Sequence, residues 1–130
     1  MMNSPKYDWT NKSILIADDE EHNFFIIEKS LQKTNIKVFH ALNGEEAVKI
    51  FKQNPDIDII LMDIRMPEMG GLEATKYIRS INRNVPIIAF TAYALSDDEA
   101  ISLEFGCDDY ISKPVRPEFL IKKINEHLNK

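Results

Sequence analysis

Hydrophobic positions in this 130-residue chain form two kinds of pattern that alternate along its length. The first is a short run of consecutive apolar residues, which is typical of a strand buried on both faces. These runs cover Ser13–Asp18, Ile36–Ala41, Ile57–Asp63, Pro86–Thr91 and Asp109–Lys113. The second places apolar residues at helical spacing. These stretches cover Glu21–Thr34, Asn43–Phe51 and Leu72–Ile81, and two more begin at Ser96 and Pro117.

A predicted helix follows each predicted strand. This alternation indicates an α/β fold, with a doubly wound five-stranded parallel sheet and helices on both of its faces. In the third helix we expect Ile78 and Ile81 to face the core. The chain length fits one domain, which we place at residues 12–130. We expect residues 1–11 to form a leader or the remnant of a linker.

Composition excludes several classes of function. The formal net charge of −5 argues against direct nucleic-acid binding, which usually requires a basic patch. No apolar run approaches the roughly 20 residues that span a bilayer, and the N-terminal residues lack the core of a signal peptide. The lone Cys107 cannot form an internal disulfide, which favours a reducing cytoplasm. We expect its thiol to be buried or inert.

Polar residues stand where four of the predicted strands end. The first strand ends in Asp18 and Asp19, the third in Asp63, the fourth in Thr91 and the fifth in Lys113. In open α/β sheets, ligands bind outside the carboxyl ends of the strands. Each residue alone has an ordinary explanation: an aspartate can cap a helix, and threonine is common in strands. Their coincidence at one edge of the sheet predicts a functional cluster.

The chemistry of this cluster suits phosphoryl transfer. Three neighbouring carboxylates repel one another unless a cation joins them, and carboxylate oxygens suit Mg²⁺. A carboxylate, a hard metal ion, a lysine and a hydroxyl are the groups that phosphoryl transfer to an aspartate requires. We therefore expect Mg²⁺ and Lys113 to neutralise the charge of a phosphoryl group transferred to one of these aspartates, and Thr91 to bind its remaining oxygen.

Four motifs, taken in their order and spacing, resemble response-regulator receiver domains over about Lys12 to Lys130. They are Ile14–Glu20, Leu61–Pro67, Phe90–Ala92 and Tyr110–Pro114. The resemblance implies the flavodoxin-like strand order 2-1-3-4-5.

The resemblance also implies the role of each site residue. Asp63 would be the phosphoacceptor, and it would bind Mg²⁺ directly together with Asp19 and the backbone carbonyl of Arg65. Asp18 would act on the metal mainly through water. Thr91 and Lys113 would contact the phosphoryl group.

Further expectations follow from the same resemblance. Tyr110 would be the switching aromatic, changing the surface around Ala94–Phe105, and the Lys113–Pro114 bond would be cis. Arg65 and Tyr93 would flank the path of the hydrolytic water. Both are large and neither is a carboxylate or amide, so we expect slow self-dephosphorylation.

The stretch Leu61–Arg79 looks most like receivers fused to hybrid sensor histidine kinases. The implied partner is a histidine kinase or histidine phosphotransfer domain, with a phosphohistidine as donor. We expect a monomer or weak dimer in the cytoplasm that contacts neither nucleic acid nor membrane. The domain would catalyse its own phosphorylation and dephosphorylation without turning over an external substrate. A stand-alone single-domain response regulator is the alternative.

Two other classes of protein share parts of this pattern. A flavodoxin-like cofactor module needs a hydroxyl- and glycine-rich loop after the first strand, where this chain has four acids, Asp18–Glu21. A metal-dependent phosphatase needs an Asp-x-Asp pair, and Asp63-Ile-Arg65 lacks the second acid. No histidine lies near the cluster by sequence. We expect the three histidines to be solvated or packing residues: His22, His40 and His127.

Overall fold

The computed structural model describes residues 7–92 and 98–129. Five strands form one parallel sheet in the order β2-β1-β3-β4-β5, as predicted. The strands are β1 (Ser13–Ala17), β2 (Lys37–Ala41), β3 (Ile59–Asp63), β4 (Ile87–Thr91) and β5 (Asp109–Ser112). Each begins or ends within two residues of the apolar run that predicted it.

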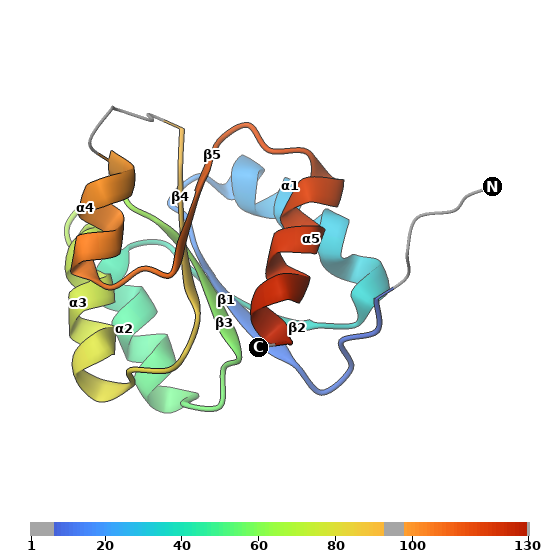
Figure 1. Ribbon diagram of the computed structural model, residues 1–130, viewed down its shortest axis with the longest axis horizontal. Coiled ribbons are helices and arrows are strands. Elements are labelled where there is room, and N and C mark those ends of the chain that lie inside the picture. Colours follow the sequence, from blue (N-terminus) through green and yellow to red (C-terminus); the bar gives the residue numbers. More distant parts are fainter. Residues whose placement is uncertain (1–6, 93–97, 130) are drawn as a thin grey trace.

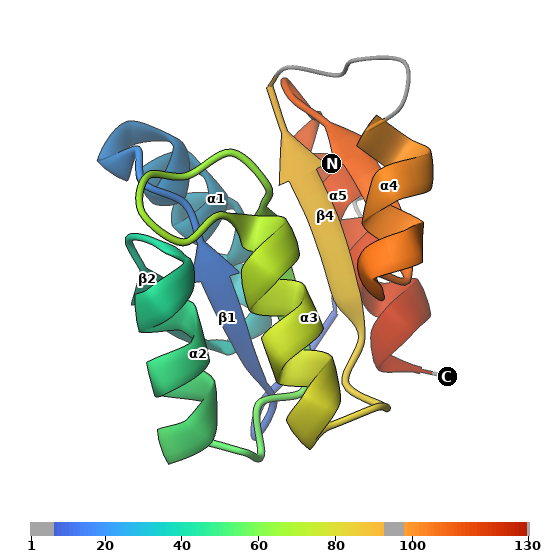
Figure 2. The same ribbon diagram turned by 90° about the vertical axis from the view of Figure 1, so that its left-hand side faces the viewer.

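Helices cover both faces of the sheet. Figures 1 and 2 show α2, α3 and α4 on one face, and α1 and α5 on the other. Their bounds are α1 (Glu21–Leu31), α2 (Gly44–Gln53), α3 (Gly71–Ile81), α4 (Asp98–Phe105) and α5 (Pro117–Leu128), with a short 3₁₀ helix η1 (Gln32–Thr34) after α1. The predicted doubly wound fold is therefore confirmed.

The sheet separates two hydrophobic cores. Successive side chains of a strand point to opposite faces, so Leu15 joins the core under α2 and α3, whereas Ile14 and Ile16 join the core under α1 and α5. Every residue of β3 and β4 is buried. This two-sided burial explains why these strands have continuous apolar runs rather than an alternating pattern.

Two local predictions need correction. Ile81 does not face the core: its side chain is 50% exposed, whereas Ile78 is fully buried. Ile81 is the last residue of α3, almost one turn beyond Ile78, where the helical pattern continues but the packing does not. The first predicted helix also changes character near its end, because Gln32–Thr34 forms a 3₁₀ turn.

The described part of the expected leader packs on the domain. Trp9 is only 5% exposed and belongs to the core under α1 and α5. Its ring stacks on Tyr7 with 5.5 Å between centroids, and its backbone N–H donates to the carbonyl of Thr34 at 2.6 Å. The packed unit therefore begins before Lys12, at least from Tyr7.

Cys107 is buried in the core under α2 and α3, as expected. Burial raises the pKa of its thiol to about 11, so little thiolate forms near neutral pH. Within the part of the chain that the structure describes, no helix combines the length and apolar character needed to cross a membrane.

The two isoleucines of α3 provide a matched test of the core. Ile78→Ala should lower the free energy of unfolding by about 2–5 kcal/mol, because it leaves a cavity between helix and sheet. Ile81→Ala should change it by about 0.5 kcal/mol or less, because the side chain is half exposed. Urea unfolding followed by the fluorescence of the buried Trp9 measures both. Equal losses in the two variants would contradict this assignment of the helix face.

Candidate functional site

The carboxyl ends of the strands bring the predicted site residues to one edge of the sheet. Asp18 and Asp19 follow β1, and Asp63 is the last residue of β3. Thr91 ends β4, where it pairs in register with Ser112, the residue before Lys113. The three aspartates each offer a carboxylate oxygen, and these oxygens lie within 4.8 Å of one another.

Lys113 joins the acids of two strands. Its Nζ donates to Asp18 Oδ2 at 2.8 Å and to Asp63 Oδ2 at 3.2 Å. The lysine side chain is only 10% exposed, and its ammonium group lies 4.9 Å from the centre of the Phe90 ring. The predicted cis peptide bond between Lys113 and Pro114 is present. A single ammonium group thus holds two carboxylates at the sheet edge.

Asp18 and Asp19 occupy different environments. Asp18 is completely buried, and its Oδ1 accepts a hydrogen bond from the Glu20 backbone N–H at 2.9 Å, while Oδ2 is held by Lys113. Its own backbone N–H donates to the carbonyl of Ala41 at 3.0 Å. Asp19 is exposed. The chain therefore fixes Asp18 internally and presents Asp19 to solvent.

Burial dominates the electrostatics of Asp63. It raises the pKa of this carboxyl above its usual value, despite the opposing effects of the Arg65 backbone N–H at 3.0 Å and of Lys113. Burial acts to lower the pKa of Lys113, but the carboxylates of Asp18 and Asp63 outweigh it and the pKa lies above its usual value. The nearby buried carboxylate of Asp18 adds to the effect of burial and also raises the pKa of Asp63.

The donor set fits a divalent cation. With all three aspartates ionised their charge is −3, and among the described residues Lys113 is the cation in ion pairs with them, which leaves −2 for the three acids and this lysine. Carboxylate oxygens without nitrogen or sulfur donors are the ligands of hard cations such as Mg²⁺. The residues present therefore suit the metal that the sequence predicts.

Arg65 and Tyr110 flank this cluster. The Arg65 guanidinium donates to both oxygens of Asp98, at 3.3 and 3.2 Å, and so links the loop after β3 to the first residue of α4. Tyr110 is partly buried in β5, and its hydroxyl is buried without a hydrogen-bond partner among the described residues. Tyr93, also predicted to lie here, is outside the described residues.

Two contributors were missed by the sequence analysis. His40, which is distant from the acids by sequence, lies beside the cluster in the fold, with its Nε2 2.9 Å from the carbonyl oxygen of Asp18. Gly71 approaches Asp63 so closely that a Cβ atom there would lie 2.2 Å from the Asp63 carbonyl oxygen. The glycine pair was a visible signal of a tight loop, whereas His40 is recognisable only once β2 is paired with β1.

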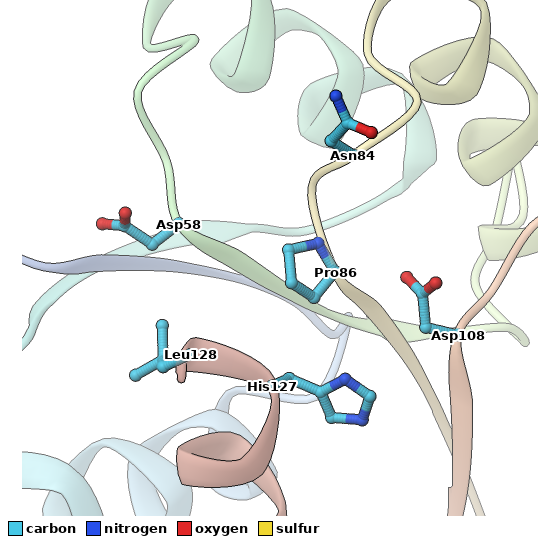
Figure 3. A pocket seen from close by; sticks show the side chains of 6 residues that line it. All are labelled: Asp58, Asn84, Pro86, Asp108, His127 and Leu128. Atoms are coloured by element: carbon cyan, nitrogen blue, oxygen red, sulfur yellow. The ribbon is translucent and has the colours of Figure 1, made fainter. Parts of the chain in front are cut away.

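A separate pocket lies at the opposite edge of the sheet. Figure 3 shows its lining, which comes from residues just before β3, β4 and β5 and from the end of α5. The cavity measures about 240 Å³ and is lined by Asp58, Asn84, Pro86, Asp108, His127 and Leu128. None of the predicted site residues lines this pocket, so the acid cluster and not the pocket is the candidate site.

The chain belongs to the response regulator receiver domain family, whose model matches residues 14–125. It is a receiver domain of two-component signalling. It is 38% identical over 127 residues to "Hybrid signal transduction histidine kinase I" of Dictyostelium discoideum, covering 92% of this chain but only 7% of the kinase. It is 35% identical over 119 residues to the polar-differentiation response regulator DivK of Brucella anthropi, covering 90% of this chain and 96% of that protein.

Solved structures share the fold. A CheY-like receiver domain protein from Methanospirillum hungatei is 31% identical with a TM-score of 0.83, over 91% of this chain and 94% of that one. CheY in a complex with CheX, BeF₃ and Mg²⁺ from Borrelia burgdorferi is 26% identical with a TM-score of 0.83, over 88% and 87% of the chains. Receiver domains generally bind Mg²⁺, and they interact with histidine kinases or phosphotransfer proteins.

The raised pKa of Asp63 predicts how this residue affects stability. Below the unfolded-state pKa, near 4, Asp63 is protonated in both states and costs nothing. As the pH rises through the higher folded-state pKa, ionisation in the folded state becomes a cost that the unfolded state does not share. Without divalent cations, the free energy of unfolding of Asp63→Asn minus that of the wild type should therefore increase as the pH rises from 4 to 7.

Urea unfolding in the presence of a chelator measures this difference. Asp56→Asn is the matched control, because Asp56 is an exposed acid outside the cluster of Asp18, Asp19 and Asp63. A difference between Asp63→Asn and wild type that stays constant or shrinks with rising pH would contradict the dominance of burial at Asp63.

Proposed function

We propose that Asp63 accepts a phosphoryl group from a phosphohistidine in a Mg²⁺-dependent reaction. The observation that carries the proposal is the convergence of three carboxylates and one buried ammonium group at the carboxyl edge of the sheet. Such a set of groups stabilises a transferred phosphoryl group mainly by position and charge. Membership of the receiver domain family supports the same reaction class.

The cation would be held by the side chains of Asp18, Asp19 and Asp63 and by the backbone carbonyl of Arg65. Asp18 would act mainly through water, which agrees with the occupation of both its carboxylate oxygens by Glu20 and Lys113. The metal would neutralise part of the negative charge of both groups and so reduce the repulsion between the phosphoryl oxygens and the carboxylate.

The protein groups fix the geometry of the acceptor. A carboxylate oxygen of Asp63 would attack phosphorus, forming the P–O bond of an acyl phosphate while the P–N bond of the donor breaks and the released imidazole takes up a proton. Lys113 Nζ donates a hydrogen bond to Asp63 Oδ2 and the Arg65 backbone N–H donates to Asp63 Oδ1, so these two contacts orient the carboxylate. Lys113 and the hydroxyl of Thr91 would bind oxygens of the transferred group.

The donor would be a histidine kinase or a histidine phosphotransfer domain. Phe25 and Ile26 support a contact on α1, beside the acid cluster, because their side chains are 54% and 48% exposed. Apolar side chains of this kind are typical of a protein-binding surface. We expect a small, transient contact, since a relay must release its partner.

We place this domain, which the resemblance bounds at residues 12–130 and against which Tyr7 and Trp9 also pack, in a hybrid sensor histidine kinase located in the cytoplasm. The identity with the Dictyostelium kinase supports this context, although the chain corresponds to only 7% of that protein. The alternative is a stand-alone regulator, supported by the match over 96% of DivK. The coding sequence that flanks this chain in its gene distinguishes the two.

Phosphorylation would then change the surface that a partner reads. It adds about −1.5 to −2 of charge at Asp63, which attracts the Thr91 hydroxyl. Movement of Thr91 leaves room for Tyr110 to rotate. Because the Tyr110 hydroxyl has no hydrogen-bond partner within residues 7–92 and 98–129, its rotation breaks no bond there. The affected face would include α4, β5 and α5.

Replacing the acceptor tests the chemistry. Asp63→Asn should abolish labelling of the protein by a radioactive small acyl phosphate in Mg²⁺, because an amide is a poor nucleophile. Asp58→Asn, at the opposite edge of the sheet, should label at the wild-type rate. Scintillation counting of the separated protein measures both. Labelling of Asp63→Asn at the wild-type rate would place the acceptor elsewhere.

A phosphoryl mimic tests the switch. Beryllofluoride with Mg²⁺ should shift the NMR signals of Tyr110 and of the 94–105 segment, of which the structure describes residues 98–105. Mg²⁺ alone is the control and should shift mainly the acid cluster. If beryllofluoride shifts only the signals of the acid cluster, the proposed switch is contradicted, whereas the acceptor role of Asp63 is not.

A further inference from the structure

His40 contacts the loop that carries two of the three acids. It stands in β2, which pairs with β1 so that His40 lies opposite Ile16, two residues before Asp18. Its Nε2 atom is 2.9 Å from the Asp18 carbonyl oxygen. A carbonyl oxygen only accepts hydrogen bonds, so Nε2 must carry the hydrogen and donate it.

The ring of His40 is also held by the helix that follows this loop. It stacks on Phe24 with 3.7 Å between ring centroids and 2° between ring planes. Phe24 lies in the first turn of α1, where its backbone N–H donates to the carbonyl of Glu20 at 3.1 Å. His40 therefore contacts the loop after β1 through a hydrogen bond at Asp18, and the helix after that loop through a ring contact at Phe24.

The hydrogen bond matters because the Asp18 carbonyl belongs to the peptide group that continues into Asp19. Asp18 is completely buried, so its carbonyl has no compensating access to water. Its other polar groups are already engaged by Ala41, Glu20 and Lys113. Without the donor, rotation of the Asp18–Asp19 peptide is the local way to give this oxygen a new partner. That rotation would re-aim the Asp19 side chain.

We propose that His40 is a positioning residue of the metal site, which orients the Asp18–Asp19 peptide and thereby the carboxylate of Asp19. The inference rests on the proposed function, because it assigns His40 to the Mg²⁺ site. Groups that orient metal ligands without touching the metal commonly change affinity by about 10- to 100-fold when removed.

Two variants separate the donor from the ring. His40→Phe keeps an aromatic ring to stack on Phe24 and removes the donor. His40→Gln loses the ring and keeps an amide N–H at a similar distance from the backbone. The dissociation constant for Mg²⁺ alone is measured by titration of the unphosphorylated protein, following the backbone amide signals of Asp19 and Glu20 by NMR. Urea unfolding without Mg²⁺ measures stability separately.

We expect His40→Phe to weaken Mg²⁺ binding by about tenfold or more, and His40→Gln by no more than about threefold. The affinity for Mg²⁺ should depend on whether residue 40 keeps an N–H donor, and it should not correlate with the stability of the metal-free variants. Wild-type affinity in His40→Phe, or equal weakening in both variants, would overturn the inference and leave the proposed acceptor role standing. A wild-type protein that binds no Mg²⁺ would overturn the proposed metal site as well.

The wild-type ring supplies an independent readout should His40→Phe fail to fold. Long-range ¹H–¹⁵N correlation spectra report which ring nitrogen is protonated. The inference requires a hydrogen on Nε2 of His40. A neutral ring protonated only on Nδ1 would show that the bond to Asp18 is absent and would overturn the inference.

Discussion

Three carboxylates lie close together at the carboxyl edge of the sheet, and the ammonium group of Lys113 stabilises two of them, Asp18 and Asp63, by forming ion pairs with both. It lies 2.8 Å from Asp18 Oδ2 and 3.2 Å from Asp63 Oδ2, in a position that is only 10% exposed. Removing one partner of a buried ion pair typically costs about 3–5 kcal/mol, because a charge is left without compensation. The separate strands β1, β3 and β5 are thereby connected at the point where chemistry is proposed.

This ion pair does not neutralise the site. A charge of −2 remains when all three acids are ionised, and burial keeps the pKa of Asp63 above its usual value. An excess of negative charge is unfavourable for a phosphate group by itself, but it suits a divalent cation that then attracts one. Crowding of the acids lowers stability when no cation is bound, and binding of the proposed cation would offset this cost.

The fold could be predicted because it depends on the pattern of apolar and polar residues along the chain. The continuous apolar run Ile57–Asp63 indicated a strand buried on both faces, and each residue of β3 is buried. The position of Asp63 at the end of that strand followed directly, as did those of Asp18 and Lys113. Parallel strands place their carboxyl ends together whatever the details of side-chain packing, so the convergence of these residues needed no knowledge of the core.

The features that the sequence did not predict are contacts between residues of different helices, strands and loops. The exposure of Ile81 depends on where α3 runs past its packing partners, and the burial of Trp9 depends on a contact with η1. Arg65 reaches Asp98 across 33 residues of sequence. His40 meets Asp18 only through the register of two neighbouring strands. Such contacts arise from tertiary register, which hydrophobic periodicity does not encode.

The central claim is that the acceptor is the carboxylate of Asp63. Reductive trapping tests it most directly, because borohydride converts an acyl phosphate into an alcohol and so turns a phosphorylated aspartate into homoserine. After reaction with an acyl phosphate and Mg²⁺, peptide mapping by mass spectrometry should locate homoserine at position 63. Homoserine at position 18 or 19 in place of 63, or phosphate recovered on a histidine, would contradict the account.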